Sequence, residues 1–161
     1  MYSSRVAKKL VNRRSALGRG NYAQVIDRIL EDKVCPFCEK HFLKYHTRPI
    51  LRRSAHWIVT ENFNPYPGTK QHLLLVHRGH IESPKKLSAK AWKELLVHLN
   101  WLQKKLNLPG GALFMRFGDL GYTGASVAHL HANIISAEKE GAGKERLAVT
   151  LGFKKKKNPR A

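Results

Sequence analysis

The sequence predicts an α+β domain, an antiparallel sheet with one long helix packed across it. Short apolar runs that are typical of strands follow one another along the chain, and segments rich in turn residues separate them. Between these runs lies one long stretch, from Ser88 to about Leu106, in which apolar residues recur at helical spacing. Consecutive strands with a single covering helix favour α+β over α/β. The 161 residues suffice for one domain with its own core.

The first segment, residues 1–33, is expected to form a helical extension in front of the main domain. Apolar residues at helical spacing predict a short helix over residues 4–17. A glycine-containing turn follows, after which Asn21 is placed to cap a second helix. The apolar side of that second helix would consist of Val25, Ile26, Ile29 and Leu30.

The main domain, residues 34–153, carries the predicted sheet and the long helix. Strands are predicted over residues 48–54, 56–60, 73–76, 112–117 and 147–151, with another in the polar–apolar alternation of residues 124–135. Ser88 is the predicted N-cap of the long helix. The expected core residues of these elements are Ile50, Trp57, Val59, Trp92, Leu95, Leu96, Leu99 and Leu102. Residues 154–161 form a lysine-rich tail, which we expect to be disordered.

The chain is strongly basic, with a formal net charge of +19 from 30 lysines and arginines against 11 acidic residues. The basic residues are dense near both ends. Such a charge attracts nucleic acid, nucleotides or anionic lipid. Neither an aromatic RNA-binding pattern nor a basic helix with base-reading residues is present, so the charge alone names no partner. Nucleic acid binding is one interpretation of the basic ends, and a solubilising tail is the other.

Composition also points to a compartment. The sequence has no run of about 18 apolar residues, so no membrane span is expected. Its basic start leads into no apolar signal segment. The two cysteines lie three positions apart and cannot staple the fold usefully, which favours a reduced, cytoplasmic protein.

The most informative stretch is Gly124–Ile135, where polar and apolar residues alternate. In a strand this period places His129, His131 and Asn133 on one face. The other face would consist of Leu130, Ala132 and Ile134. Two imidazoles beside a carboxamide form a site for an anion, a metal or both. The alternative is one buried, hydrogen-bonded histidine and one that is merely exposed.

Cys35-Pro36-Phe37-Cys38 forms a compact turn with two thiols. A thiolate pair at this spacing fits one edge of a tetrahedral zinc site. Since the chain has no second Cys-x-x-Cys, the other ligands would have to be histidines. Two buried free thiols or a redox pair are the alternatives.

Together these features resemble the motifs of the histidine triad (HIT) superfamily, in the family's order. The Cys-x-x-Cys turn is followed by Asn62–Leu75, similar to the family's N-x-x-P…P-G-H-x-L-V, although Thr69-Lys70-Gln71 intervene before the histidine. Gly79-His80-Ile81 comes next, and the His-x-His strand after a Gly-x-Ser-Val turn completes the set over residues 35–136. The resemblance implies a HIT-like antiparallel sheet with helices, usually a homodimer that binds nucleotides.

The resemblance also assigns roles to individual residues. In zinc-bearing HIT proteins and in the related galactose-1-phosphate uridylyltransferases, the remaining zinc ligands match His80 and His129, which would join Cys35 and Cys38 in a structural zinc site with no open position. The middle histidine, which attacks the α-phosphate, matches His131.

Three further positions would contact the substrate. Ser126 matches the small hydroxyl residue that contacts phosphate, and Asn62 matches the position near the ribose. Asn133 stands where the family has its third histidine; the uridylyltransferase branch also has a neutral amide there. Asn133 can donate to a phosphate oxygen but cannot deliver a proton, and the alternative is an ordinary polar residue at the strand edge.

Other positions of the motif are less informative. Ala125 stands where many members have glutamine, a lost phosphate contact for which Arg116 or Lys70 could compensate. His72 is interpreted as a structural, hydrogen-bonded histidine. The histidines without support from any motif are His41, His46, His56, His77 and His98.

We therefore expect a HIT-like nucleotide hydrolase or nucleotidyltransferase. It would attack the α-phosphate of a dinucleoside polyphosphate or a nucleotide ester through a nucleotidyl-histidine intermediate. A non-catalytic nucleotide- or RNA-binding module is one alternative, and a hydrolase of adenylated nucleic-acid ends is the other.

Overall fold

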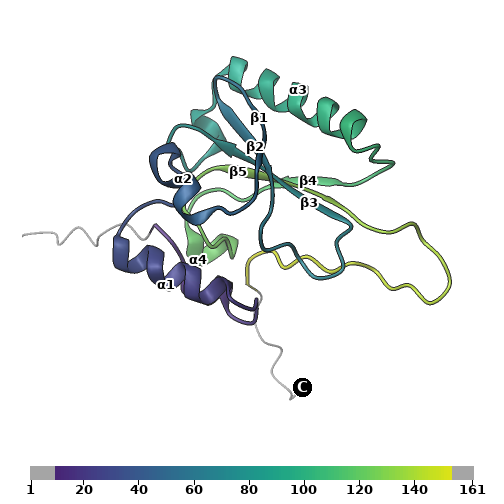
Figure 1. Ribbon diagram of the computed structural model, residues 1–161, viewed down its shortest axis with the longest axis horizontal. Coiled ribbons are helices and arrows are strands. Elements are labelled where there is room, and N and C mark those ends of the chain that lie inside the picture. The colour runs from purple at the N-terminus through teal and green to yellow at the C-terminus, as the bar shows by residue number, and fades with distance from the viewer. Residues whose placement is uncertain (1–9, 154–161) are drawn as a thin grey trace, which may run out of the picture.

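A five-stranded antiparallel sheet with the order β1-β2-β3-β5-β4 forms the centre of the computed structural model, which describes residues 10–153 (Figure 1). Its strands are β1 (Ile50–Arg53), β2 (Trp57–Glu61), β3 (Gln71–His77), β4 (Ala112–Met115) and β5 (His131–Ser136). Each strand pairs antiparallel with its neighbours. The α+β class predicted from the sequence is confirmed.

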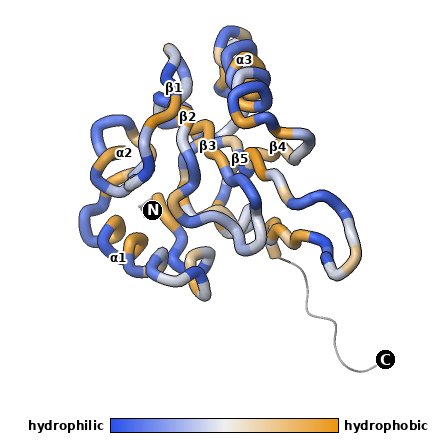
Figure 2. Tube along the Cα trace, turned by 45° about the vertical axis from the view of Figure 1, so that its right-hand side comes forward, coloured by the Kyte–Doolittle hydropathy of each residue, from blue (hydrophilic) through white to orange (hydrophobic). Residues whose placement is uncertain are grey.

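One face of the sheet is covered by the long helix α3 (Ala89–Lys105). The hydroxyl of Ser88 accepts from the amide of Ala91 at 3.1 Å, so the predicted N-cap is confirmed. The α3 residues Leu95 and Leu102 pack with apolar side chains of β2, β3 and β5. Figure 2 shows apolar residues concentrated along the central strands, while α3 alternates between polar and apolar.

Two of the expected helix contacts are wrong. Trp92 and Leu96 were expected to pack on the sheet, but their exposed fractions are 41% and 55%. Only the line of side chains through residues 91, 95, 98 and 102 is fully buried. The apolar stripe of α3 is therefore wider than the strip of sheet that it covers.

The opposite face carries the 3-10 helix η1 (Arg13–Ala16), α1 (Tyr22–Asp32) and α2 (Glu39–Tyr45). Side chains of this layer form a second core with the strands, from which Ile26 of α1, Phe42 of α2 and Leu74 of β3 are buried. Successive β3 residues alternate between the two cores, as the strand period requires. Residues 10–32 thus share a core with the cysteine turn. The boundary between a helical extension and the main domain at residue 33 stays a prediction.

Of the predicted helix over residues 4–17, the described part contains only the 3-10 helix η1 at Arg13–Ala16, and residues 4–9 lie outside the described residues. Val11 instead forms an antiparallel bridge with Val127. Its neighbours complete the pairing, because Asn12 N donates to Ser126 O at 2.8 Å and Ala128 N donates to Leu10 O at 2.8 Å. Residues 126–128 leave backbone groups unpaired, and the N-terminal segment satisfies them.

Smaller differences concern the ends of elements. The segment 147–151 forms no strand, and its carbonyl at Thr150 instead accepts from the Arg116 side chain at 2.6 Å. The predicted strand over residues 124–135 is regular only from His131. Asn21 occupies the N-cap position of α1, but its side chain makes no capping hydrogen bond. The predicted tail, residues 154–161, lies outside the described residues.

Within the described residues, no helix is long and apolar enough to cross a membrane. The short helix α4 (Leu120–Thr123) and the 3-10 helix η2 (Pro84–Lys86) complete the fold. α4 ends at Gly124, whose positive φ of 66° turns the chain toward β5.

Candidate functional site

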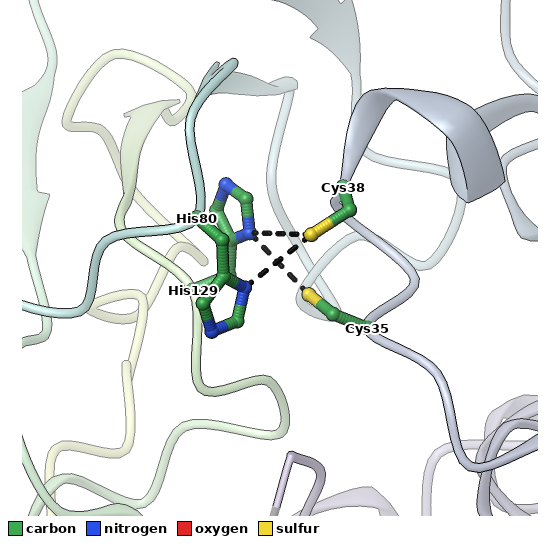
Figure 3. Close-up of side chains that lie close together, drawn as sticks. All are labelled: Cys35, Cys38, His80 and His129. Atoms are coloured by element: carbon green, nitrogen blue, oxygen red, sulfur yellow. Dashed lines mark hydrogen bonds between the residues drawn. The ribbon is translucent and has the colours of Figure 1, made fainter.

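Four nitrogen- and sulfur-bearing side chains meet beside the sheet, one from each of four positions in the sequence. Cys35 and Cys38 come from the turn between α1 and α2, His80 follows β3, and His129 precedes β5 (Figure 3). One ligand atom from each side chain lies within 4.8 Å of the others. The cluster predicted from the sequence can therefore bind a metal ion.

Both histidines turn Nδ1 toward the sulfurs. His129 Nδ1 lies 3.3 Å from Cys35 Sγ, and His80 Nδ1 lies 3.4 Å from Cys38 Sγ. The other nitrogen of each ring faces an acceptor: His129 Nε2 lies 2.5 Å from the His77 carbonyl, and His80 Nε2 lies 3.5 Å from a Glu82 carboxylate oxygen. A donor on Nε2 leaves the Nδ1 lone pair for a metal, the arrangement typical of metal-binding histidines. The Cys₂His₂ set fits zinc.

Burial shapes the protonation of this cluster. It raises the pKa of the Cys35 thiol to about 12 and lowers the pKa of His129 to about 4. The imidazole is thus held neutral, which a metal ligand requires. A buried thiolate needs a nearby cation, and a metal ion would supply it.

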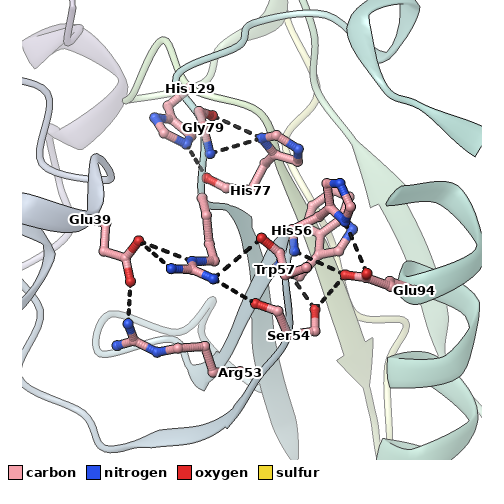
Figure 4. A network of polar contacts seen from close by, with 11 residues as sticks. Glu39, Arg53, Ser54, His56, Trp57, His77, Gly79, Glu94 and His129 are labelled. Carbon is pink, nitrogen blue, oxygen red and sulfur yellow. Dashed lines mark hydrogen bonds and ion pairs between the residues drawn. The ribbon is translucent and has the colours of Figure 1, made fainter. Parts of the chain in front are cut away.

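A polar network fixes the segment that carries His80 (Figure 4). Arg78, two residues before His80, donates to Glu39 Oε2 at 3.0 Å, and Glu39 directly follows Cys38. Arg78 also donates to the carbonyl of Ser54 at 2.9 Å. The network therefore connects the cysteine turn, the histidine segment and the β1–β2 turn independently of any metal.

His131 begins β5 next to this cluster. Its Nδ1 lies 2.7 Å from the carbonyl oxygen of His129, to which it donates. Burial, reinforced by the charge of Arg116, lowers the pKa of His131 to about 4. The ring is therefore neutral at physiological pH, with Nε2 as the unprotonated nitrogen. The ring of Phe37 packs edge-on at 5.1 Å between centroids.

Asn133 is 2% exposed and hydrogen-bonded, rather than an ordinary residue at the strand edge. Its Oδ1 lies 3.0 Å from His72 Nε2, and His72 Nδ1 in turn accepts from the amide of Tyr66 at 3.2 Å. These contacts agree with a structural role for His72, whose pKa is lowered chiefly by burial. The amide nitrogen of Asn133 is buried without a partner among the described residues.

A cavity unites the residues that the sequence assigned to the substrate. Asn62, Ser126, His131 and Asn133 all line it, although they come from separate segments. Arg116 lines it too, whereas Lys70 lies 3.8 Å from Glu138 and not in the cavity wall. Of the two basic residues considered for an extra phosphate contact, only Arg116 is placed for one.

Arg19 and Tyr22 are among the residues of this cavity that sequence reasoning missed. Both belong to the N-terminal segment, which reaches residues 126–128 through the bridge between Val11 and Val127. The only signal in the sequence was the Gly-Arg-Gly turn at residues 18–20, which by itself indicates a turn and no ligand.

Comparison with solved structures identifies the fold. The chain is similar to a HIT family hydrolase from Legionella pneumophila Philadelphia 1, with a TM-score of 0.51 and 16% identity over 66% of this chain and 97% of the other. A histidine triad nucleotide-binding protein from Candida albicans gives a TM-score of 0.51 and 17% identity, over 69% and 83% of the two chains. A HIT family protein from Bacillus anthracis gives 0.50 and 18%, over 70% and 82%.

The sequence comparisons add nothing to this result, since no protein-family model and no curated protein matches the chain. At these identities the structural likeness shows the fold alone. The chain has the fold of histidine triad proteins, and the predicted HIT-like architecture is confirmed.

Proposed function

We propose that this protein is a nucleotide hydrolase or nucleotidyltransferase that attacks the α-phosphate of its substrate through His131. The observation that carries the proposal is the neutral His131 ring, held by its Nδ1 at 2.7 Å from a backbone carbonyl in the wall of a cavity. That tautomer presents the Nε2 lone pair as a nucleophile. The same cavity offers donors for the attacked phosphate.

In the proposed reaction, His131 Nε2 forms a bond to the α-phosphorus and the leaving oxygen departs with its bonding electrons. Water or another acceptor then attacks the phosphorus and releases the histidine. The Ser126 hydroxyl and the unpartnered Asn133 amide would donate to the non-bridging oxygens, and Asn62 would contact the ribose.

Asn133 limits the choice of leaving group. A carboxamide cannot transfer a proton at neutral pH, so a leaving group that departs as an alkoxide or amide anion would receive no help from it. The proposed substrates are therefore those whose leaving oxygen is stable as an anion, such as dinucleoside polyphosphates.

Zinc is the metal that we propose for the Cys₂His₂ cluster. Cys35, Cys38, His80 and His129 would hold it, and when bound it would act structurally as the centre that fixes the cysteine turn to the catalytic strand. By fixing His129, the metal would also hold the carbonyl that orients His131.

Covalent labelling tests the proposal. Protein incubated with nucleotides labelled at the α-phosphorus and then denatured should retain label on a histidine, because phosphoramidate bonds survive mild alkali. Peptide mapping should place the label on His131. If wild-type protein acquires no label and turns over none of a panel of dinucleoside polyphosphates and nucleotide esters, yet binds them, it is the binding module that we considered as the alternative.

The high positive charge keeps adenylated nucleic-acid ends in the same panel. A groove that adjoins the cavity at Arg19, Tyr22 and Phe63 also carries Arg28 and Lys44 and could take a longer anionic chain. Turnover that rises with the length of the attached oligonucleotide and weakens in salt would favour that substrate over a free nucleotide.

We further propose a cytoplasmic homodimer. Among the described residues, β4 pairs with β5 alone and is an edge of the sheet, and Leu113 on it is 41% exposed. An edge strand with an apolar side chain is suited to pairing with a second copy. Light scattering on the full chain measures this directly. The reduced thiols of the cluster agree with a reducing compartment.

A further inference from the structure

Two arginines reach the cavity of His131, one from before the motif region of residues 35–136 and one from within it. Arg19 lies in the turn between Gly18 and Gly20, just before α1, and Arg116 follows β4. Both guanidinium groups lie against one aromatic ring, since they are 5.1 Å and 5.9 Å from the centroid of Tyr66. The two positive charges are thus gathered around a single side chain in the cavity wall.

Each guanidinium donates to a backbone carbonyl, but one of its buried N–H donors has no partner. Arg19 Nη2 donates to the carbonyl of Asn64 at 2.7 Å, and Arg116 Nη2 donates to that of Thr150 at 2.6 Å. The Nε–H of each arginine is buried without a hydrogen-bond partner among the described residues. A guanidinium has five N–H donors, and a buried donor that makes no hydrogen bond costs free energy. Unmade donors beside a cavity indicate that a ligand completes them.

The charge of the cavity is equally unbalanced. Neither Arg19 nor Arg116 has a carboxylate partner in the described part of the chain, and the residues lining the cavity include no aspartate or glutamate. The Asn133 amide adds a third buried donor without a partner. An anion with several oxygens is the ligand that satisfies two cations and an amide at once.

The arginines are also held in place before any ligand arrives. The Arg19 guanidinium lies 4.7 Å from the ring centroid of Tyr22, which lines the same cavity as Ser126. Arg116 donates to the Tyr66 hydroxyl at 2.9 Å. These contacts tie both arginines to the same wall as Ser126, which reduces the entropy cost of ordering them on binding.

We propose that Arg19 and Arg116 form a second anion subsite beside His131, which binds the phosphoryl group next to the attacked α-phosphate. The inference rests on the proposed function and narrows its substrate to nucleoside polyphosphates, those with at least one further phosphate beyond the α-phosphate. Nucleotide esters with an uncharged leaving group lack the group that this subsite binds.

The subsite also supplies what Asn133 lacks. As the His131–phosphorus bond forms, the bond from phosphorus to the bridging oxygen breaks, and its electron pair stays on that oxygen. The departing phosphate or pyrophosphate keeps the charge without a proton. Two guanidinium groups next to it stabilise that charge as it develops. Water then opens the intermediate: the water oxygen bonds to phosphorus, and the electron pair of the phosphorus–nitrogen bond returns to Nε2. The proton that the water loses passes to solvent.

Binding without turnover gives the first test. The His131→Ala protein lacks the nucleophile, so calorimetry can compare the affinities of ATP, GTP, CTP and UTP with those of their monophosphates. The triphosphate that binds best should have an affinity about tenfold or more above that of its monophosphate. Arg19→Gln or Arg116→Gln should remove most of that difference and leave monophosphate affinity within about threefold. The corresponding lysine variants, which keep the charge, should retain part of it. Arg52→Gln on β1, an arginine that lines neither the cavity nor the neighbouring groove, should change neither affinity.

Turnover gives the second test, in protein that keeps His131. Arg116→Gln should lower kcat/KM for a dinucleoside polyphosphate by on the order of 10²-fold and that for a 4-nitrophenyl nucleotide ester by less than about threefold. Thermal melts identify any glutamine variant that is merely unfolded. For such a position, the kinetics of the lysine variant are used instead. Equal losses on both substrates, or no triphosphate preference in the parent protein, would overturn the subsite. A preference that depends on the arginines in a protein that never labels His131 would support the subsite and overturn the proposed catalysis instead.

Discussion

The Nδ1 nitrogen of His131 lies 2.7 Å from the carbonyl oxygen of His129, two residues earlier in the chain. His129 in turn points its Nδ1 at Cys35 Sγ from 3.3 Å. One short run of backbone therefore joins the candidate metal centre to the candidate nucleophile. The two histidines have different tasks although they are almost adjacent, and substitutions should separate them.

His131→Ala should abolish turnover while the protein remains folded. Loss of a covalent nucleophile commonly costs on the order of 10⁴-fold in kcat. Steady-state kinetics, with metal content and thermal midpoint measured alongside, check this. The matched control is His41→Ala on α2, which should keep its activity; unchanged turnover in His131→Ala would end the nucleophile assignment.

Cys38→Ala should release the metal and destabilise the protein together. Four side chains from separate segments converge here, so the bound ion would contribute to folding. A loss of ~4 kcal/mol corresponds to a fall in midpoint of roughly 10 °C for a chain of this size. Elemental analysis of untagged wild-type protein should find one zinc per chain. Wild-type protein free of metal and equally stable with a chelator would contradict the assignment.

Asn133→Asp should weaken the binding of anionic substrates, whereas Asn133→His should be tolerated. The carboxylate would bring negative charge into a cavity that holds Arg116, His131 and an expected phosphate. We expect kcat/KM to fall on the order of 10²-fold for the aspartate variant. The histidine variant restores a proton donor, and should extend turnover to esters with poorer leaving groups. Kinetics on paired substrates that show no difference between the two variants would speak against a phosphate contact at this position.

Stability should fall in mild acid because of His46. Burial, with the charge of Arg48, lowers the pKa of His46 from 6.5 to about 4, and its Nε2 lies 2.7 Å from the hydroxyl of Thr60. Because the folded state binds the proton more weakly than the unfolded chain, this contribution is complete above pH 6.5 and is lost as the pH falls toward 4. At 1.36 kcal/mol per pKa unit it amounts to about 3 kcal/mol at most.

Denaturant titrations across that pH range measure the effect. His46→Gln keeps a donor for Thr60 but cannot titrate, so its free energy of unfolding should be lower at pH 7 and should change less between pH 6.5 and 4. Comparing the two proteins cancels the acid release of metal, which both share. Parallel curves would show that His46 is protonated equally in both states.

Local patterns predicted what local geometry decides. The alternation in residues 124–135 placed Leu130, Ala132 and Ile134 on one face of a strand, and all three lie in the core that α3 shares with the sheet. Ser88 caps the long helix because capping involves only neighbouring residues. The convergence of the cysteine turn with two histidines came from the family resemblance, since its members lie far apart in sequence.

The errors and omissions have the opposite origin. Helical spacing around Val11 was overruled by a backbone pairing with Val127, which no local pattern encodes. Arg19 reaches the cavity only because α1 packs against the sheet, and a lone arginine between two glycines gives no sign of that partner. Tertiary contacts decide such positions.

The pairing of Val11 with Val127 constrains the order of events when the chain is made. Val11 is synthesised well before its partner, which lies 116 residues later in the chain. Closing so long a loop is slow and entropically costly. Until it closes, Arg19 and Tyr22 have no fixed wall to join. A nascent chain stalled before residue 127 would also lack β5, the strand between β3 and β4, and would have no cavity. The capacity to bind an anion should therefore appear abruptly, once Asn133 has been synthesised and this pairing has closed.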